Sequence, residues 1–220
     1  VCRNHSATHL LQKALQIVLG DHVEQQGSYQ DGARTRFDFS HGQAMTAEEI
    51  AKVEALVNEK IAEDIAVVTD IMSIEDAKKS GAMALFGEKY GEVVRVVQMG
   101  TFSSELCGGT HVSNTRNISA FKIISESGVA AGVRRIEALT GKALFEYYNT
   151  MESELQEAAK LLKAVPLEVS AKVVSLQDEV KQLQKENDKL KAKLAKEAAG
   201  DLLSEAKEVD GIHILTKQLT

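Results

Sequence analysis

The chain has 220 residues, of which 44% are hydrophobic and 26% charged, and its formal net charge is -6. This length is enough for one domain of about 150 residues with an appendage. No run reaches the roughly 18 apolar residues of a membrane-spanning helix, and the acidic balance argues against a general nucleic-acid coat.

The start of the chain and its cysteines indicate a cytoplasmic piece of a longer protein. Val1 is not an initiator methionine, so we expect further residues to precede it in the full protein. Cys2 and Cys107 are the two cysteines, too few for a disulfide framework. We therefore expect reduced cysteines and a cytoplasmic location.

The first forty residues predict a helix followed by a strand. Asn4 is placed to cap a helix that ends at Gly20. Residues 34–40 alternate in polarity, with two phenylalanines on one face and Arg36 among the polar residues of the other. This pattern predicts a half-buried strand.

Helices and strands continue to about residue 142. Thr46 and Glu49 form a capping-box pattern ahead of a helix at 47–63, and Ser73 starts a shorter helix in the same way. Further strands are predicted at 65–71, 92–99, 120–126 and 133–140. Because this order lacks the regular rhythm of a parallel sheet, we predict an α+β domain with a largely antiparallel sheet and packed helices.

Residues 143–199 predict helices that carry a heptad seam on both sides of Pro166. After the proline, valine recurs at one seam position and leucine at the other, with the polar Asn187 in the series. The seam fits an antiparallel hairpin within one chain, which we favour because the link is short, or a parallel homodimer with a second copy. Residues 200–220 predict a short helix and a strand, the truncated start of a C-terminal globular domain.

Two short motifs together predict a metal site. In HSATH, His5 and His9 lie four residues apart on one helix face, and CGGTH holds Cys107 and His111 at the same spacing. One thiolate and three imidazoles form a suitable tetrahedral shell for zinc. Glycines between the second pair let the backbone turn tightly.

The role of such a site stays open on these residues alone. Four protein ligands make a closed shell, which is typical of structural zinc. If one ligand position is open to water, the metal supplies a nucleophile instead. A third possibility is a metal-free Cys107 nucleophile with a histidine base, which the three histidines at paired spacings disfavour.

Five motifs in this order resemble the editing domain of the alanyl-tRNA synthetase family. They are NHSATHLL, RFDFSH, GAMALFGEKYG, ELCGGTHV and GVRRIEALTG. The likeness covers about residues 3–142. The threonyl-tRNA synthetase editing domain shares the metal motifs but usually has a proline where this chain has Thr110. The heptad region favours a synthetase over a free-standing alanyl-tRNA editing factor.

The resemblance implies hydrolysis of the ester that joins serine or glycine to the 3′ end of tRNA(Ala). It implies zinc at the four motif residues, and it indicates Thr8 and Gln25 as residues that contact the substrate. A polar editing site can read the seryl hydroxyl, which an apolar synthetic site rejects poorly. From the residues themselves, the backbone N–H groups of Gly108 and Gly109 are candidates to hold a carbonyl oxygen as charge builds.

Three arginines are candidates to contact tRNA phosphate. Strand alternation places Arg134 and Arg135 on opposite faces, so one of them can contact the tRNA acceptor end. Arg36 either forms an ion pair with a neighbouring acid or lines the channel that holds the acceptor end.

The resemblance divides the chain into an editing domain (1–142), a helical linker (143–199) and the start of a C-terminal domain (200–220). The expected partners are the tRNA(Ala) acceptor end, the missing aminoacylation and C-terminal domains of the same chain, and a second copy through the helical region. ATP use belongs to the missing part. The alternative function is a non-catalytic, zinc-stapled module for tRNA binding or dimerisation.

Overall fold

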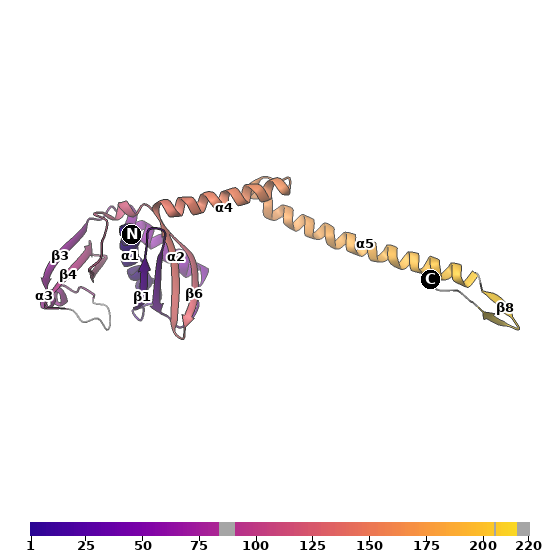
Figure 1. The fold of residues 1–220 in the computed structure, drawn as a ribbon, viewed down its shortest axis with the longest axis horizontal. Coiled ribbons are helices and arrows are strands. Elements are labelled where there is room, and N and C mark those ends of the chain that lie inside the picture. Colours follow the sequence, from indigo (N-terminus) through magenta and orange to yellow (C-terminus); the bar gives the residue numbers. More distant parts are fainter. Residues whose placement is uncertain (84–90, 205, 215–220) are drawn as a thin grey trace. The chain divides into compact units, whose positions relative to one another are not determined.

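The computed structural model describes residues 1–83, 91–204 and 206–214, which form two compact units, Val1–Thr150 and Met151–Thr220. The helix α4 runs from the first unit into the second (Figure 1). The elements up to α4 are α1 (Cys2–Leu19), β1 (Gln25–Gln30), β2 (Thr35–Ser40), α2 (Ala47–Ala62), β3 (Val67–Ser73), α3 (Ile74–Lys79), β4 (Val93–Met99), β5 (Ser103–Leu106), the 3-10 turn η1 (Thr115–Ile118), β6 (Phe121–Ala130), β7 (Val133–Thr140) and α4 (Gly141–Leu161).

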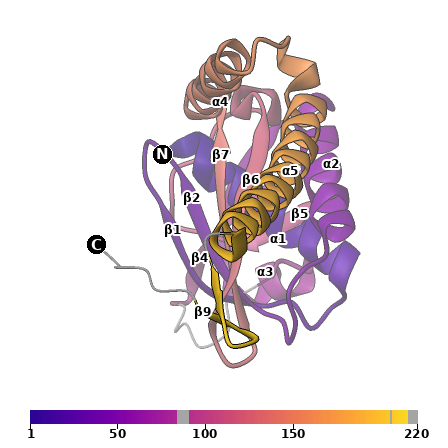
Figure 2. The same cartoon turned by 90° about the vertical axis from the view of Figure 1, so that its right-hand side faces the viewer.

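Two antiparallel sheets organise the first unit. The larger has the strand order β1-β2-β7-β6, and Figure 2 shows these strands side by side in that order. The smaller has the order β3-β4-β5. The helix α1 contacts α2, the strands β1, β2 and β7 of the larger sheet, and β5 of the smaller one. The predicted α+β class with antiparallel sheets is confirmed, and α1 contacts both sheets.

The main core fixes α1 against the larger sheet. Phe37 and Phe39 of β2 are fully buried, as the alternation in residues 34–40 predicts. Apolar side chains of α1, α2, β4, β6 and β7 also belong to this core, among them Leu10, Leu11, Leu15, Val53, Val57 and Ile136. Burial of a large apolar side chain contributes about 1.5–3 kcal/mol. The position of the polar face of α1 is therefore set by a well-packed apolar face.

The predicted start of α2 is confirmed in atomic detail. Thr46 Oγ1 accepts a hydrogen bond from the Glu49 backbone N–H at 3.2 Å, and the Glu49 carboxylate accepts one from the Thr46 backbone N–H at 2.8 Å. Ser73 caps α3 by accepting from the backbone N–H of Asp76. Both helices begin where their capping residues predict, because these side chains satisfy otherwise unpaired donors of the first turn.

The predicted cap of α1 is wrong. The helix begins at Cys2, so Asn4 lies inside it and is buried. Its amide donates a hydrogen bond to the Asp31 carbonyl at 2.9 Å, and its oxygen accepts one from Thr140 Oγ1 at 2.6 Å. Asn4 thus ties α1 to the β1–β2 turn and to β7, and these tertiary partners displace the local capping role.

The second unit contains the long helix with the heptad seam. Its elements are the end of α4, the 3-10 turn η2 (Pro166–Glu168), α5 (Val169–Ser204), β8 (Lys207–Val209) and β9 (Ile212–Ile214). Seam side chains of α5 are exposed, Leu183 to 55%, Leu190 to 61% and Leu194 to 64%. The antiparallel hairpin that we favour from the sequence and the parallel homodimer both stay predictions.

The chain end differs from its prediction. The helix expected after residue 200 is the last part of α5, and the expected single strand is a two-stranded antiparallel pair, β8 with β9. The limits predicted at 142 and 199 for the domains stay predictions. Residues 84–90, which hold most of the motif GAMALFGEKYG and its Lys89, lie outside the described residues. None of the described helices is long and apolar enough to cross a membrane.

Candidate metal centre

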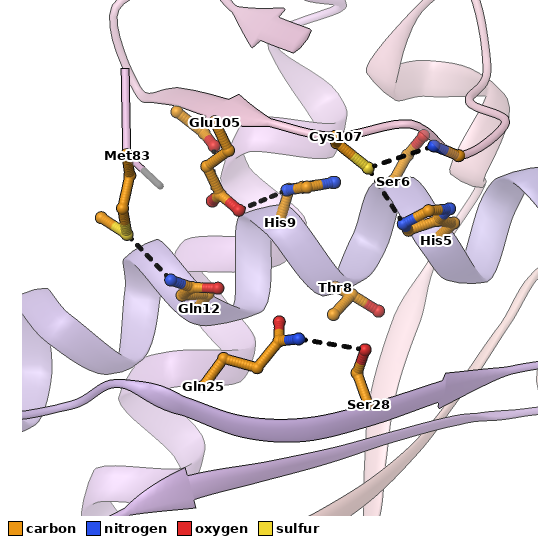
Figure 3. Close-up of polar contacts among 12 residues, drawn as sticks. His5, Ser6, Thr8, His9, Gln12, Gln25, Ser28, Met83, Glu105 and Cys107 are labelled. Carbon is orange, nitrogen blue, oxygen red and sulfur yellow. Dashed lines mark hydrogen bonds and ion pairs between the residues drawn. The ribbon is translucent and has the colours of Figure 1, made fainter. Parts of the chain in front are cut away.

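The helix α1 presents two imidazoles one turn apart. His5 and His9 stack with ring centroids 5.4 Å apart, as residues separated by four positions on a helix do. His9 is 7% exposed and faces the smaller sheet, where β5 passes (Figure 3). The packing of α1 against both sheets therefore holds this pair inside the first unit.

The segment that follows β5 brings the other two residues to the same place. Cys107 Sγ lies 3.4 Å from His5 Nε2 and 3.3 Å from His111 Nε2. The four candidate ligand atoms of His5, His9, Cys107 and His111 all lie within 4.8 Å of one another. Tetrahedral zinc, with bonds of about 2.0–2.1 Å to nitrogen and about 2.3 Å to sulfur, separates its nitrogen and sulfur ligands by about 3.6 Å. The donor set and its spacing fit zinc.

The unpaired atom of His9 supports the same fit. Its Nδ1 lies 2.6 Å from Glu105 Oε2, while its Nε2 is buried and has no hydrogen-bond partner among the described residues. A buried polar atom without a partner is costly. A metal ion among the four residues would satisfy this nitrogen, because neutral imidazole binds metals through its lone pair.

The charges of the cluster suit a metal ligand at Cys107, whereas at His9 a bound metal ion would have to displace a proton. Burial lowers the pKa of His9, but the Glu105 carboxylate and the Cys107 sulfur outweigh this effect and raise the pKa to about 10. Burial raises the pKa of the Cys107 thiol, whereas hydrogen bonds from His111, His5 and other neighbours lower it to about 3. Cys107 is thus held as the thiolate, which is the form that binds metals.

The two glycines of CGGTH have different surroundings, and neither has a left-handed backbone. A Cβ added to Gly109 would lie 1.9 Å from His5 Cε1, whereas one added to Gly108 would meet no atom within 4 Å. Gly109 is therefore required for the close approach of this segment to the His5 ring. Its N–H donates to Cys107 Sγ at 3.4 Å, so it is directed at sulfur rather than at a substrate carbonyl.

Sequence reasoning missed three side chains that touch the four candidate ligands or their segment. Glu105 contacts His9, and Ser6 Oγ lies 3.2 Å from His111 Nδ1. The Arg95 guanidinium donates to the backbone carbonyls of Cys107 and Gly109 and so holds the segment after β5. Ser6 lies inside HSATH and Glu105 lies two residues before Cys107, so their closeness to the ligands in the sequence was an available signal. The contact of Arg95 depends on strand pairing, and no local feature of the sequence indicates it.

The two predicted substrate-contacting residues lie on facing elements. The Thr8 hydroxyl is buried, donates to the Asn4 carbonyl at 2.8 Å and lies 2.8 Å from Thr35 Oγ1. Gln25 is the first residue of β1, and its Nε2 donates to Ser28 Oγ at 3.3 Å. Gln25 and Ser28 point from β1 toward the helix that carries Thr8 and the histidines (Figure 3). Their roles stay predictions.

The three arginines proposed for tRNA contact are engaged with other side chains. Arg135 makes two hydrogen bonds of 2.7 Å to Asp38, and Arg134 makes a similar pair with Glu126. Arg36 lies 4.0 Å from Asp38 and stacks over the Tyr29 ring at 5.9 Å. The guanidinium groups of Arg134 and Arg135 are thus neutralised by carboxylates. Contact of these residues with tRNA phosphate stays a prediction, and it requires the phosphate to replace the carboxylate partner.

Comparison with known proteins gives consistent matches. A family model described as the second additional domain of threonyl and alanyl tRNA synthetases matches residues 94–137, which span β4 to β7. Alanine–tRNA ligase 1 of Lachnoclostridium phytofermentans is 62% identical over 99% of this chain and 25% of its own length. The alanine–tRNA ligases of Bacillus cytotoxicus and Ralstonia nicotianae are 54% and 52% identical over 100% and 99% of the chain. The chain spans about a quarter of the length of these curated relatives.

Proposed function

The chain belongs to the alanyl-tRNA synthetase family, and from this premise we propose that it hydrolyses the ester between serine or glycine and tRNA(Ala). The observation that carries the proposal is the convergence of three imidazoles and one thiolate beside a polar stretch of β1. Zinc is the proposed metal, held by His5, His9, Cys107 and His111. The relatives are named as ligases, so the editing reaction is an inference from the site.

The side chains around the cluster suit the recognition of a small polar amino acid. A bound zinc ion supplies either Lewis-acid polarisation of the ester or a water of lowered pKa. Gln25 offers an amide on the side of β1 that faces α1 (Figure 3) and is a candidate to bind the seryl hydroxyl. Thr8 would have to exchange its contacts with Asn4, Thr35 and Gln30 before its hydroxyl could bind the substrate. A site that hydrogen-bonds a hydroxyl can reject an analogue without it by about 10⁴-fold or more, which protects the alanyl ester. The Gly108 N–H stays a candidate to bind the ester carbonyl.

The proposed partners follow from the same family membership. The tRNA(Ala) acceptor end is the substrate, and the remaining three quarters of the synthetase supply the aminoacylation site and the C-terminal domain. We also propose a homodimer through the α5 seam and a cytoplasmic location. Of the three arginines, Arg36 has the longest distance to a carboxylate, 4.0 Å from Asp38. We therefore propose Arg36 as the first candidate for contact with tRNA phosphate.

The alternative function is a zinc-stapled binding module without catalysis. Four protein ligands within 4.8 Å form a closed shell, which is usual for structural zinc. Such a module would retard tRNA(Ala) in a gel-shift assay and leave its seryl ester intact.

Gln25 provides a test of the proposed recognition. Its replacement by leucine keeps the size of the side chain but removes its hydrogen bonds. We expect hydrolysis of seryl-tRNA(Ala) to slow by roughly five- to tenfold, the effect of one hydrogen bond of about 1–1.4 kcal/mol. Hydrolysis of glycyl-tRNA(Ala) serves as the control and is expected to change by less than about twofold, because glycine has no hydroxyl to lose. Equal slowing of both esters would show that Gln25 acts on their shared part.

A further inference from the structure

Two ligand histidines are held at the ring nitrogen that faces away from the cluster centre. His9 Nδ1 lies 2.6 Å from a Glu105 carboxylate oxygen, and His111 Nδ1 lies 3.2 Å from Ser6 Oγ. Ser6 Oγ also accepts a hydrogen bond from the Val112 backbone N–H at 3.1 Å, which fixes its place. Glu105 is 5% exposed and Ser6 is fully buried. Both contacts are therefore sheltered from water.

The Glu105 contact determines which nitrogen of the neutral His9 ring is available, whereas the Ser6 hydroxyl, which can donate or accept, fixes the orientation of the His111 ring. A neutral imidazole carries one N–H, and the other nitrogen is an acceptor or metal ligand. A carboxylate can only accept, so in the neutral form that binds a metal Glu105 would keep the His9 proton on Nδ1 and direct the lone pair of Nε2 at the ion. This Nε2 is the buried nitrogen without a hydrogen-bond partner among the described residues. The Nε2 of His111 lies 3.3 Å from Cys107 Sγ and faces the same centre.

The buried carboxylate also needs a compensating charge. Glu105 Oε1 accepts a hydrogen bond from Ser103 Oγ at 3.0 Å, and its other oxygen contacts His9. Neither partner is a Lys or Arg cation. In the metal-bound form, in which all three imidazoles would be neutral, the Glu105 carboxylate and the Cys107 thiolate would together balance one divalent cation. Burial of a charge is tolerated when it is paired in this way.

We propose that Glu105 and Ser6 are positioning residues of the metal centre, which direct Nε2 of His9 and of His111 at the ion, and that Glu105 also raises the affinity through its charge. The inference rests on the proposed zinc site and does not depend on the editing reaction. Outer partners of metal-bound histidines typically change metal affinity by about 10–100-fold when they are removed.

The test is a zinc affinity measurement on the full chain by competition with a chromophoric chelator, without tRNA. Glu105→Ala is expected to weaken zinc binding by about 10–100-fold. Glu105→Gln is expected to weaken it less, because the amide oxygen still accepts from Nδ1–H but carries no charge. Ser6→Ala is expected to weaken it by about tenfold. The absorption spectrum of the cobalt-substituted protein, which reports ligand geometry, is expected to shift in both alanine variants.

Ser103→Ala is the matched control, since it removes the other hydrogen bond of Glu105 and leaves the contact with His9. Its zinc affinity is expected to stay within about threefold of the wild type. Wild-type affinity in Glu105→Ala, or an equal loss in Ser103→Ala, overturns the proposal. If Glu105→Ala does not fold, the comparison of Glu105→Gln with Ser103→Ala decides, and unchanged affinity in Glu105→Gln overturns the charge contribution. A wild-type chain that binds zinc tightly but hydrolyses no ester contradicts the proposed function and leaves this test intact.

Discussion

Replacement of Gly109 by alanine is expected to lower zinc affinity by more than about 100-fold, beyond the range typical of outer contacts. The new methyl group would lie 1.9 Å from His5 Cε1 and 2.4 Å from His5 Nδ1, far inside contact distance. The imidazole has to swing away or the segment after β5 has to retreat. Either movement separates His5 from Cys107, so the variant loses a ligand while the core under α1 stays packed.

Gly108→Ala is the control for this prediction. A methyl group there would meet no atom within 4 Å, and its backbone is not in the left-handed region. Its zinc affinity is expected to stay within about threefold of the wild type, measured by chelator competition on both variants together with their circular dichroism spectra. An equal loss in both variants would instead show that both glycines are needed for the tight turn between Cys107 and His111. Wild-type affinity in Gly109→Ala would mean that the loop does not approach His5 as closely as described.

Cys107→Ala is expected to abolish both stoichiometric zinc binding and hydrolysis of seryl-tRNA(Ala). The sulfur has contacts of 3.3–3.4 Å to His111, His5 and the Gly109 N–H, and it is the sole thiolate of the candidate ligand set. Its removal leaves three imidazoles and an unpaired loop N–H. Full hydrolytic activity in this variant would contradict any role of the centre in editing.

Loss of activity in Cys107→Ala does not by itself separate a metal ligand from a nucleophile. Removal of zinc from the wild-type chain by a chelator makes the distinction, because a cysteine nucleophile has to be free of metal. We expect activity to be lost with the metal and to return on addition of zinc. Activity that persists or rises in the metal-free protein would identify Cys107 as the nucleophile.

Elements whose signal is local could be predicted from the sequence. The capping pair of Thr46 and Glu49 starts α2, and strand β7 coincides with the predicted 133–140. Strand β1 was missed because QQGSYQ has one large apolar residue and a glycine, so its pairing with β2 rather than its own pattern makes it a strand. The four-residue β5 is likewise defined by its neighbour β4.

The metal motifs illustrate the same limit at the site. The spacing in the sequence predicts that His5 lies beside His9 and that Cys107 lies beside His111. The structure brings the two pairs together. The partners that orient them, Glu105 and Arg95, become evident when β4 and β5 are paired beside α1. The opposite faces of Arg134 and Arg135 follow from strand alternation, but their carboxylate partners depend on the register of β7 with β2 and β6.

The most direct test of the proposed function is the hydrolysis of seryl-tRNA(Ala) and alanyl-tRNA(Ala) by this chain, with zinc content measured on the same sample. We expect turnover of the seryl ester, no turnover of the alanyl ester, and about one zinc ion per chain, as the single ligand cluster among the described residues requires. Full zinc occupancy without hydrolysis of the seryl ester would contradict a catalytic centre and identify the metal as a structural staple in this chain.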